Sequence, residues 1–315
     1  MKASIALLLS SLLAPAYAGT YSISHTVLPT GFLDFFEFEA IADPTHGRVN
    51  YVNKATAVAQ GLVKKASNTS YIIRADDKTV LNPSGAGRNS VRIKSTKTFT
   101  KHVAVFDVHH MPQGCGTWPA IWEVNEPQWP NGGEIDIVEG VNDQGPNAAT
   151  LHTGAGCTMP ASRKETGTPT LLDCNANVNG NAGCGVKFPT ANSYGPAFNN
   201  NGGGWYAVER APAGIKVWFW PRHSTTVPAG VKNGGSSVNT DNWGTPTANF
   251  PNTSCDISQH FAAHNIIINL TFCGDWAGSV YSQSGCPSTC DDYVNNNPGA
   301  FSKAYFDFAS IRVYE

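Results

Sequence analysis

Charged side chains are scarce: they make up 14% of the 315 residues, and 21 Lys and Arg against 23 Asp and Glu leave a net charge of −2. The sequence has no basic stripe that would bind nucleic acid or anionic lipid. Beyond the N-terminal segment, no apolar run approaches the length of a membrane span. We also find no internal repeat, appended binding module or low-complexity tail. The sequence therefore argues against nucleic-acid and membrane partners.

The N-terminal segment has the pattern of a secretory signal. A positively charged start precedes an apolar stretch over residues 5–13, and a small-x-small cleavage site ends at Ala18. The stretch is too short to span a bilayer comfortably. We therefore expect a signal peptide over residues 1–18 and a single catalytic domain over residues 19–315. The C-terminus has no apolar tail of the kind that directs a lipid anchor, so we expect a released, extracellular protein.

Glycine (31) and proline (20) are plentiful. This composition is typical of many short strands joined by turns, not of long helices. A chain of this length could form one large β domain or two smaller ones. Strand patterns continue on both sides of the loop over residues 224–235 without a shift in composition, which favours one domain.

All eight cysteines follow the signal segment, and an even number in a secreted protein indicates disulfides. A zinc site is a poor alternative. The only closely spaced pair is Cys286 and Cys290, and no second pair or His doublet completes a tetrahedral ligand set. Cys174–Cys184 and Cys286–Cys290 are the candidates for local disulfides.

Three carboxylates stand among apolar β-formers in the stretch Glu134-Ile-Asp136-Ile-Val-Glu139. In a regular strand, Glu134 and Asp136 would share one face and Glu139 would point to the other. A β-bulge between Asp136 and Glu139 would return Glu139 to the first face, and the two Glu carboxyls could then approach the ~5–5.5 Å separation of a retaining glycosidase. The alternative is a surface strand whose acids simply face water.

The flanking residues favour the catalytic interpretation. Gly116–Trp122 reads Gly-Thr-Trp-Pro-Ala-Ile-Trp, and the chain closes with the strand Phe306–Tyr314. Downstream of the acidic strand come Leu151–Thr153 and Asn269–Trp276, the latter reading Asn-Leu-Thr-Phe-Cys-Gly-Asp-Trp. With Glu-x-Asp-x-x-Glu, these motifs resemble glycoside hydrolase family 16, and most closely its secreted fungal endo-1,3(4)-β-glucanases of the laminarinase type. The resemblance covers roughly residue 30 to the end.

The resemblance implies an all-β fold: a jelly-roll β-sandwich of the concanavalin A type, with two curved antiparallel sheets and an open cleft on the concave face. It also implies that Glu134 is the nucleophile, that Glu139 is the acid/base and that Asp136 supports Glu134. Physical chemistry adds that the pKa of Glu139 should be raised, so that it is protonated when substrate binds. Because the three acids share a strand, their titration should be coupled.

Three tryptophans, Trp118, Trp122 and Trp129, shortly precede Glu134. One tryptophan can pack a core, but three beside paired carboxylates are typical of platforms for sugar rings. We expect Trp122 and Trp129 to bind substrate and Trp118 to belong to the core. The resemblance implies further binding roles for Asn50, Arg92, His152 and Trp276. The alternatives to a binding role are that Arg92 lies on a solvated strand face and that His152 is structural.

The pattern also predicts neighbours for the acidic strand. The strand over residues 98–108 is expected beside it, and Ala149–Thr153 should return antiparallel to it after a turn. The apolar run Ile266–Phe272 suits a strand buried on both faces. Asn68 and Asn252 are candidate glycosylation sites in turns, whereas the sequon at Asn269 is expected to be too buried.

We therefore expect retaining endo-hydrolysis of β-1,3- or mixed β-1,3/1,4-glucan by a monomer, with no metal and no organic cofactor. One alternative is a β-glucan transglycosylase with the same carboxylates. Another is a silent jelly-roll lectin that binds glucan, and a third is agarase- or carrageenase-like specificity. Binding of a sulfated polymer would need a more basic cleft than this composition offers.

Overall fold

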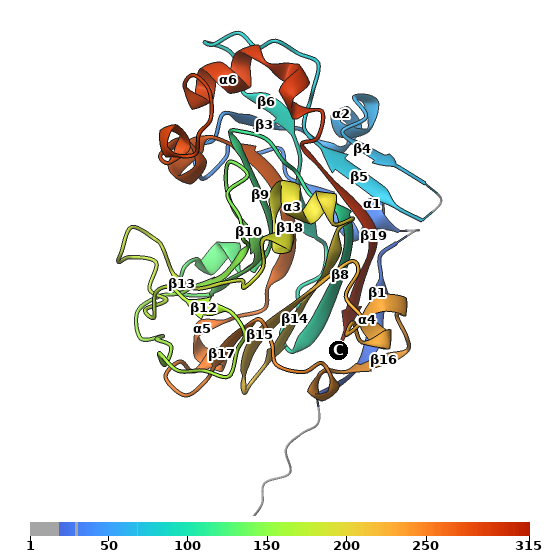
Figure 1. The fold of residues 1–315 in the computed structure, drawn as a ribbon, viewed down its shortest axis with the longest axis vertical. Coiled ribbons are helices and arrows are strands. Elements are labelled where there is room, and N and C mark those ends of the chain that lie inside the picture. Colours follow the sequence, from blue (N-terminus) through green and yellow to red (C-terminus); the bar gives the residue numbers. More distant parts are fainter. Residues whose placement is uncertain (1–18, 29–30, 68) are drawn as a thin grey trace, which may run out of the picture.

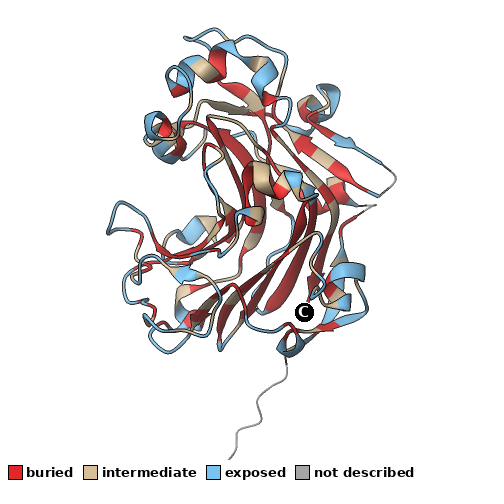
Figure 2. Cartoon of the chain, viewed as in Figure 1, coloured by how far each residue is buried: buried red, intermediate tan, exposed pale blue. Residues whose placement is uncertain are grey.

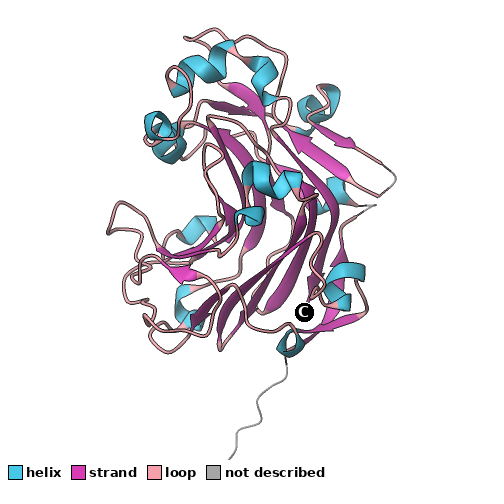
Figure 3. Ribbon diagram, in the orientation of Figure 1, coloured by secondary structure: helices cyan, strands magenta, loops and turns pink. Residues whose placement is uncertain are grey.

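The computed structural model describes residues 19–28, 31–67 and 69–315 (Figure 1). The signal peptide expected over residues 1–18 and the glycosylation candidate Asn68 lie outside the described residues. Two antiparallel sheets face each other, and short helices and loops surround them (Figure 3). This arrangement confirms the predicted β-sandwich. None of the helices in the described ranges is long and apolar enough to cross a membrane.

One sheet has eight strands among the described residues and carries the acidic strand near its middle. In spatial order its strands are β12 (Thr168–Pro169), β13 (Cys184–Lys187), β11 (Ala148–His152), β10 (Glu134–Glu139), β9 (Thr117–Val124), β18 (Asn265–Phe272), β7 (Arg92–Ser95) and β2 (Phe36–Phe38).

The other sheet has nine strands within the same part of the chain. Its main path is β16 (Ser237–Asn239), β1 (Thr20–Thr26), β19 (Tyr305–Tyr314), β8 (His102–His110), β14 (Gly204–Ala211), β15 (Gly214–Pro221) and β17 (Ala248–Pro251). Off this path, β5 (Tyr71–Arg74) pairs with β19, and β4 (Val63–Lys65) pairs with β5. A small parallel pair joins β3 (Val49–Tyr51) to β6 (Arg88–Ser90).

Aliphatic and aromatic side chains from both sheets form the main core. Ile121, Ile135 and Ile268 enter it from the eight-stranded sheet, and Phe106 and Val208 enter it from the nine-stranded sheet; all five are fully buried. In Figure 2 the buried strands form a continuous layer through the molecule. The alternation of apolar and polar residues along these strands thus decides which face of each sheet turns inward.

Short helices lie around the sandwich. They are α1 (Phe32–Phe35), α2 (Lys54–Ala59), α3 (Gly195–Asn200), α4 (Ala229–Asn233), α5 (Ile257–His260) and α6 (Cys290–Asn296). The segment containing α4 and β16 covers a second buried cluster on the outer face of the nine-stranded sheet, which includes Trp205, Trp218 and Trp243. A third cluster lies beneath α6 and includes Phe272 and Phe301.

The neighbours of β10 are β9 and β11, both antiparallel to it. The return of residues 149–153 beside the acidic strand is therefore confirmed, and β18 is buried along nearly its whole length, as expected. The placement of residues 98–108 beside the acidic strand is wrong. That segment forms β8, which lies between β19 and β14 in the other sheet. β8 is buried on both faces because it lies between the main core, which holds Phe106, and the second cluster, which holds Val105, so its alternation does not reveal which sheet it joins.

All eight cysteines are paired, as Cys115–Cys286, Cys157–Cys255, Cys174–Cys184 and Cys273–Cys290. The predicted pairing of Cys174 with Cys184 is confirmed, and the pairing of Cys286 with Cys290 is wrong. Cys290 begins α6 and bonds to Cys273 just after β18, whereas Cys286 reaches the segment before β9. The two bonds tie this loop to the ends of two sheet strands rather than closing a small ring within it.

Candidate active site

The acidic strand β10 contains a β-bulge between Asp136 and Glu139. Against β11, Asp136 pairs with Thr150 and Glu139 pairs with Ala148, so β10 advances three residues where β11 advances two. The register against β9 shifts at the same place, between Asp136 and Val138. The bulge predicted from the spacing of the carboxylates is therefore present.

The bulge brings the three acids to one face of the sheet. Across β9, Glu134, Asp136 and Glu139 lie opposite Val124, Trp122 and Ala120, which are alternate residues of a regular strand and so share one face. The residues between the acids, Ile135, Ile137 and Val138, are fully buried in the main core. We call the opposite side of the sheet, with Glu134, Asp136 and Glu139, the carboxylate face.

His152 lies directly across from Glu134 in the ladder and contacts the central acid. Its Nε2 is 3.3 Å from Oδ2 of Asp136, and its Nδ1 is 2.9 Å from Oδ1 of Asn181. Burial alone would lower the pKa of His152, but its hydrogen bond to Asp136 and the charges of Asp136, Glu134 and Glu139 outweigh burial and raise that pKa to about 10. The imidazole is therefore a cation at neutral pH and holds Asp136 from one side.

Burial raises the pKa of Glu134 and of Glu139, each to about 8, and the charge of Asp136 adds to both shifts. Opposing effects differ between the two. His152, the Trp129 side chain and Arg92 favour the ionised form of Glu134, whereas Trp118 and His152 favour that of Glu139. Arg92 is thus a cation that favours the ionised form of Glu134 in addition to His152, while the pKa values of the two acids are raised to the same extent. The predicted rise in the pKa of Glu139 is confirmed in direction.

Trp118 belongs to this face and not to the core, so its expected core position is wrong. Its indole Nε1 donates a hydrogen bond of 2.9 Å to Oε1 of Glu139, and its side chain is only partly buried. Trp276, which is 37% exposed, meets the Trp118 ring edge to face, with centroids 5.7 Å apart. The signal was available in the sequence, since Trp118 and Trp122 are four residues apart in one strand and must share a face.

Trp122 is held from two sides on the carboxylate face. Its Nε1 donates to Oδ1 of Asn269 over 2.8 Å, and the Asn269 amide donates in turn to the hydroxyl of Tyr51 over 3.0 Å. The Arg92 guanidinium lies over the Trp122 ring, 4.9 Å from its centroid. The sequence argument identified Trp122 and Arg92 but not Asn269 or Tyr51, whose roles depend on contacts between distant strands.

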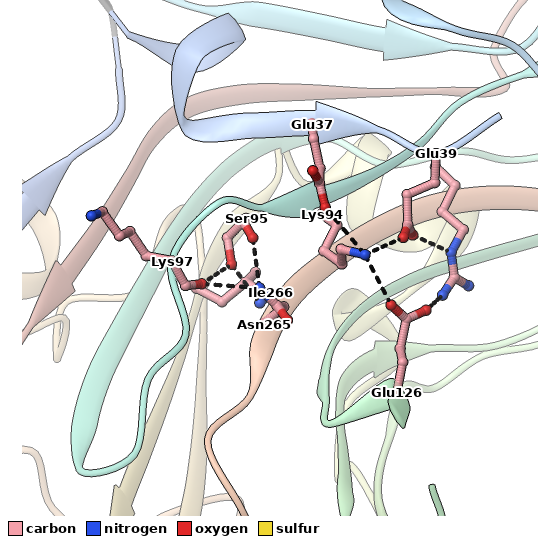
Figure 4. A network of polar contacts seen from close by, with 9 residues as sticks. Glu37, Glu39, Lys94, Ser95, Lys97, Glu126, Asn265 and Ile266 are labelled. Carbon is pink, nitrogen blue, oxygen red and sulfur yellow. Dashed lines mark hydrogen bonds and ion pairs between the residues drawn. The ribbon is translucent and has the colours of Figure 1, made fainter. Parts of the chain in front are cut away.

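Arg92 is only 4% exposed and belongs to a network of ion pairs at the β7–β2 end of the sheet. It pairs with Glu39 over 2.7 Å and also with Glu126. Figure 4 shows Lys94 reaching the same two acids, and its Nζ is 2.5 Å from Glu39 and 3.2 Å from Glu126. The network neutralises the buried guanidinium and fixes it against Trp122, so the solvated-face alternative for Arg92 is wrong.

The remaining candidates lie at different distances from the carboxylates. Trp129 is 43% exposed in the turn before β10, and its side chain contacts Glu134 closely enough to affect the pKa of that acid. Asn50 on β3 donates to Asn89 over 2.7 Å, and its adjacent residue, Tyr51, makes the link to Asn269. Sugar binding by Asn50 stays a prediction.

Glu134, Asp136 and His152 place possible metal-ligand atoms within 4.8 Å of one another. A histidine must be neutral to coordinate a metal. Both ring nitrogens of His152 face oxygen acceptors, Oδ2 of Asp136 and Oδ1 of Asn181, so the arrangement suits an ion pair better than a metal ligand set. Proton transfer and nucleophilic attack by carboxyl groups are the chemistry that these residues can perform.

Comparisons with known proteins agree with this geometry. The family model for the XgeA-like catalytic GH16 domain matches residues 36–314. The GH16 laminarinase 16A of Phanerochaete chrysosporium, solved with 6-O-glucosyl-laminaritriose in its donor and acceptor sites, is 64% identical. The match covers 94% of this chain and 100% of that chain, with a TM-score of 0.93. An elongating GH family 16 β-1,3-glucosyltransferase is 39% identical over 94% of this chain and 100% of that chain, with a TM-score of 0.87.

A probable endo-1,3(4)-β-glucanase of Aspergillus fumigatus is 43% identical over 94% of this chain. The match covers 46% of that relative, so this chain spans less than half of its length. The extent of the family match and the structural agreement confirm both the predicted family and the predicted jelly-roll sandwich. The chain belongs to glycoside hydrolase family 16, as an XgeA-like catalytic domain.

Proposed function

We propose that this chain is an endo-glucanase that hydrolyses β-1,3- and mixed β-1,3/1,4-glucans with retention of anomeric configuration. The bulge in β10 carries the proposal, because it places Glu134 and Glu139 on one face of the sheet beside Trp118 and Trp122. The laminarinase with bound β-glucan, at 64% identity, supports the substrate class.

In the first step, Glu134 attacks the anomeric carbon and Glu139 donates its proton to the departing glycosidic oxygen. A covalent glycosyl-enzyme forms and the aglycone leaves. In the second step, Glu139, now ionised, takes a proton from water as the water attacks the anomeric carbon, and Glu134 is released. We assign the nucleophile to Glu134 from the resemblance of Glu134-Ile-Asp136-Ile-Val-Glu139 to the family's motif, and the charge of Arg92, which favours the ionised form of Glu134, supports this assignment.

Asp136 and His152 would support this chemistry without reacting themselves. Asp136 holds the imidazolium of His152 between the strands, and the charge of that imidazolium offsets the repulsion among the three acids. Trp118, Trp122, Trp129 and Trp276 offer flat apolar surfaces to the sugar rings on either side of the bond.

The test is incubation of the purified protein with laminarin, lichenan, agarose and xyloglucan, followed by sizing of the products and NMR of the first anomer released. We expect internal cleavage of laminarin and lichenan, with the β-anomer appearing first. Glu134→Gln should reduce turnover by roughly 10⁴-fold or more while the fold is retained. Robust laminarin hydrolysis by the folded variant would rule out the assigned role of Glu134.

Transglycosylation is the second candidate, and the 39% identity to an elongating β-1,3-glucosyltransferase favours considering it. Such an enzyme would pass the same glycosyl intermediate to a sugar hydroxyl in place of water. Products longer than the substrate at high acceptor concentration would separate the two activities. A lectin that only grips glucan would release no reducing ends in either assay.

We propose further that the protein is secreted and acts as a monomer. Four disulfides require an oxidising compartment in most organisms, which supports an extracellular location. Asn252 lies exposed in the turn after β17, where its amide donates one hydrogen bond to the Pro212 carbonyl, and it is the better candidate for glycosylation because Asn269 is only 7% exposed. Mass spectrometry of the secreted product would test the glycan at Asn252.

A further inference from the structure

Asn147 bonds to the backbone on both sides of the residue that the bulge inserts. Its Oδ1 accepts a hydrogen bond of 3.0 Å from the Glu139 N–H, and its Nδ2 donates one of 2.9 Å to the Ile137 carbonyl. A bulge disrupts the regular ladder at this place and leaves backbone groups in need of other partners. The side-chain amide of Asn147 thus satisfies one backbone N–H and one backbone carbonyl of the strand that carries the acids.

Asn147 is itself firmly held. Its side chain is fully buried, its N–H donates to Oγ of Ser193 over 3.0 Å, and its carbonyl accepts from the N–H of Phe188 over 2.9 Å. Ser193 donates in turn to the Thr190 carbonyl. The segment after β13, which contains Phe188 and Ser193, therefore holds the backbone of Asn147 just before β11, so its amide has a fixed position relative to the bulge.

Few other side chains could make the same pair of bonds. An amide presents one acceptor oxygen and donor hydrogens in a single plane. Leucine would offer neither, and an ionised aspartate would place a second oxygen against the Ile137 carbonyl. The asparagine is thus matched to the N–H of Glu139 and the carbonyl of Ile137 together.

We propose that Asn147 is a positioning residue for the acid/base carboxyl: it fixes the bulge and thereby the direction in which Glu139 leaves the strand. This inference rests on the proposed function of Glu139. A one-residue slip in a strand moves every side chain to the opposite face, so Glu139 is the side chain whose direction depends most on the bulge. Glu134 and Asp136 precede the bulge and keep their face in either register.

The test compares kcat/KM on two substrates that need different amounts of acid assistance. Laminarin has a poor leaving group that must be protonated, whereas 2,4-dinitrophenyl β-laminaribioside has a good one that leaves without help. For Asn147→Ala we expect a loss of about 10²-fold on laminarin, within the range of general acid catalysis, and less than about 5-fold on the dinitrophenyl substrate. If Asn147→Ala fails to fold, the nearly isosteric Asn147→Asp takes its place with the same expected difference.

Asn199, in α3, provides a matched control away from the carboxylate face. Its amide also clamps one backbone N–H and one carbonyl, those of Met111, over 2.9 and 3.0 Å. Asn199→Ala should lower the melting temperature but change kcat/KM on the two substrates by the same factor. Glu139→Ala serves as the reference for complete loss of acid assistance and should show the largest difference between the substrates.

The outcomes distinguish a failure of the positioning role of Asn147 from a failure of the acid/base role of Glu139. A difference between the substrates in both Glu139→Ala and Asn147→Ala supports the inference. A difference in Glu139→Ala alone, with Asn147→Ala losing both activities equally or neither, overturns the role of Asn147 and leaves the proposed function intact. If Glu139→Ala shows no difference, the acid/base assignment fails, and the inference that rests on it fails as well.

Discussion

The indole of Trp118 donates a hydrogen bond of 2.9 Å to the carboxyl of Glu139. A bond to the ionised form lowers the pKa of an acid, so its loss should raise the pKa of Glu139 further above about 8. In Trp118→Phe we therefore expect the basic limb of the kcat/KM profile on laminarin to move to higher pH, with kcat reduced by about 10-fold. An unchanged basic limb in a folded variant would show that Trp118 does not act on Glu139.

The raised pKa values of Glu134 and Glu139 make these acids a cost to stability. A carboxyl whose pKa is higher in the folded than in the unfolded state contributes most to the free energy of unfolding below its unfolded pKa, here 4.5. This contribution is lost as pH rises through the folded pKa of about 8. Glu134→Gln and Glu139→Gln should therefore unfold at higher temperature than the parent. Each kcal/mol gained should raise the melting temperature by roughly 2–4 °C.

Melting curves at several pH values between 4.5 and 8 would check this prediction, because the gain should grow with pH across that window. The neutral variant Asn199→Gln offers a control, since it removes no titrating group. A gain that is constant with pH would contradict the prediction.

Glu123 and His102 form a fully buried pair between the sheets, with 2.9 Å between Nε2 and Oε1. Removing one partner leaves an uncompensated polar group, so Glu123→Ala should cost about 3–5 kcal/mol of stability. His46 and Asp275 form a pair of the same 2.9 Å length with both side chains exposed, and Asp275→Ala should cause no measurable loss. Urea unfolding of the two variants makes the comparison, and equal losses would refute the role of burial.

Arg92 bonds to two carboxylates and covers the ring of Trp122 at the same time. Lysine keeps the charge but lacks the planar fork, so it cannot do all three. Arg92→Lys should lower kcat/KM on laminarin by about 10-fold, mainly through KM, because Trp122 loses its support while Glu134 and Glu139 stay in place. Lys64→Arg, on an exposed part of β4, should leave both constants unchanged.

The return of β11 follows from local alternation and a short turn. The bulge and the common face of the three acids could be predicted because regular alternation separates Glu139 from the other two acids, and the flanking motifs favoured the interpretation that reunites them. Alternation cannot tell which sheet a strand joins, which is why residues 98–108 were assigned to the wrong neighbour. The same limit applies to Cys286: its partner, Cys115, lies 171 residues away and is brought near only by the packing of α6 over the sheet edge.

Trp118 and Asn147 were missed for different reasons. Trp118 shares a face with Trp122, so the strand period alone could have placed it beside Glu139. Asn147 stood at the end of what read as an ordinary turn, where asparagine is common for its own sake. Its bonds to Ile137 and Glu139 appear only once the bulge has been located in three dimensions.

The Cys174–Cys184 bond closes the short loop that carries Asn181, and Asn181 is the contact that holds the outer nitrogen of His152. We therefore expect reduction of this bond to loosen the contact between Asn181 and His152. Catalytic efficiency should decline at reductant concentrations that leave the circular dichroism spectrum of the sheets unchanged. The state of the Cys174–Cys184 bond should therefore be checked before the activities of two preparations are compared.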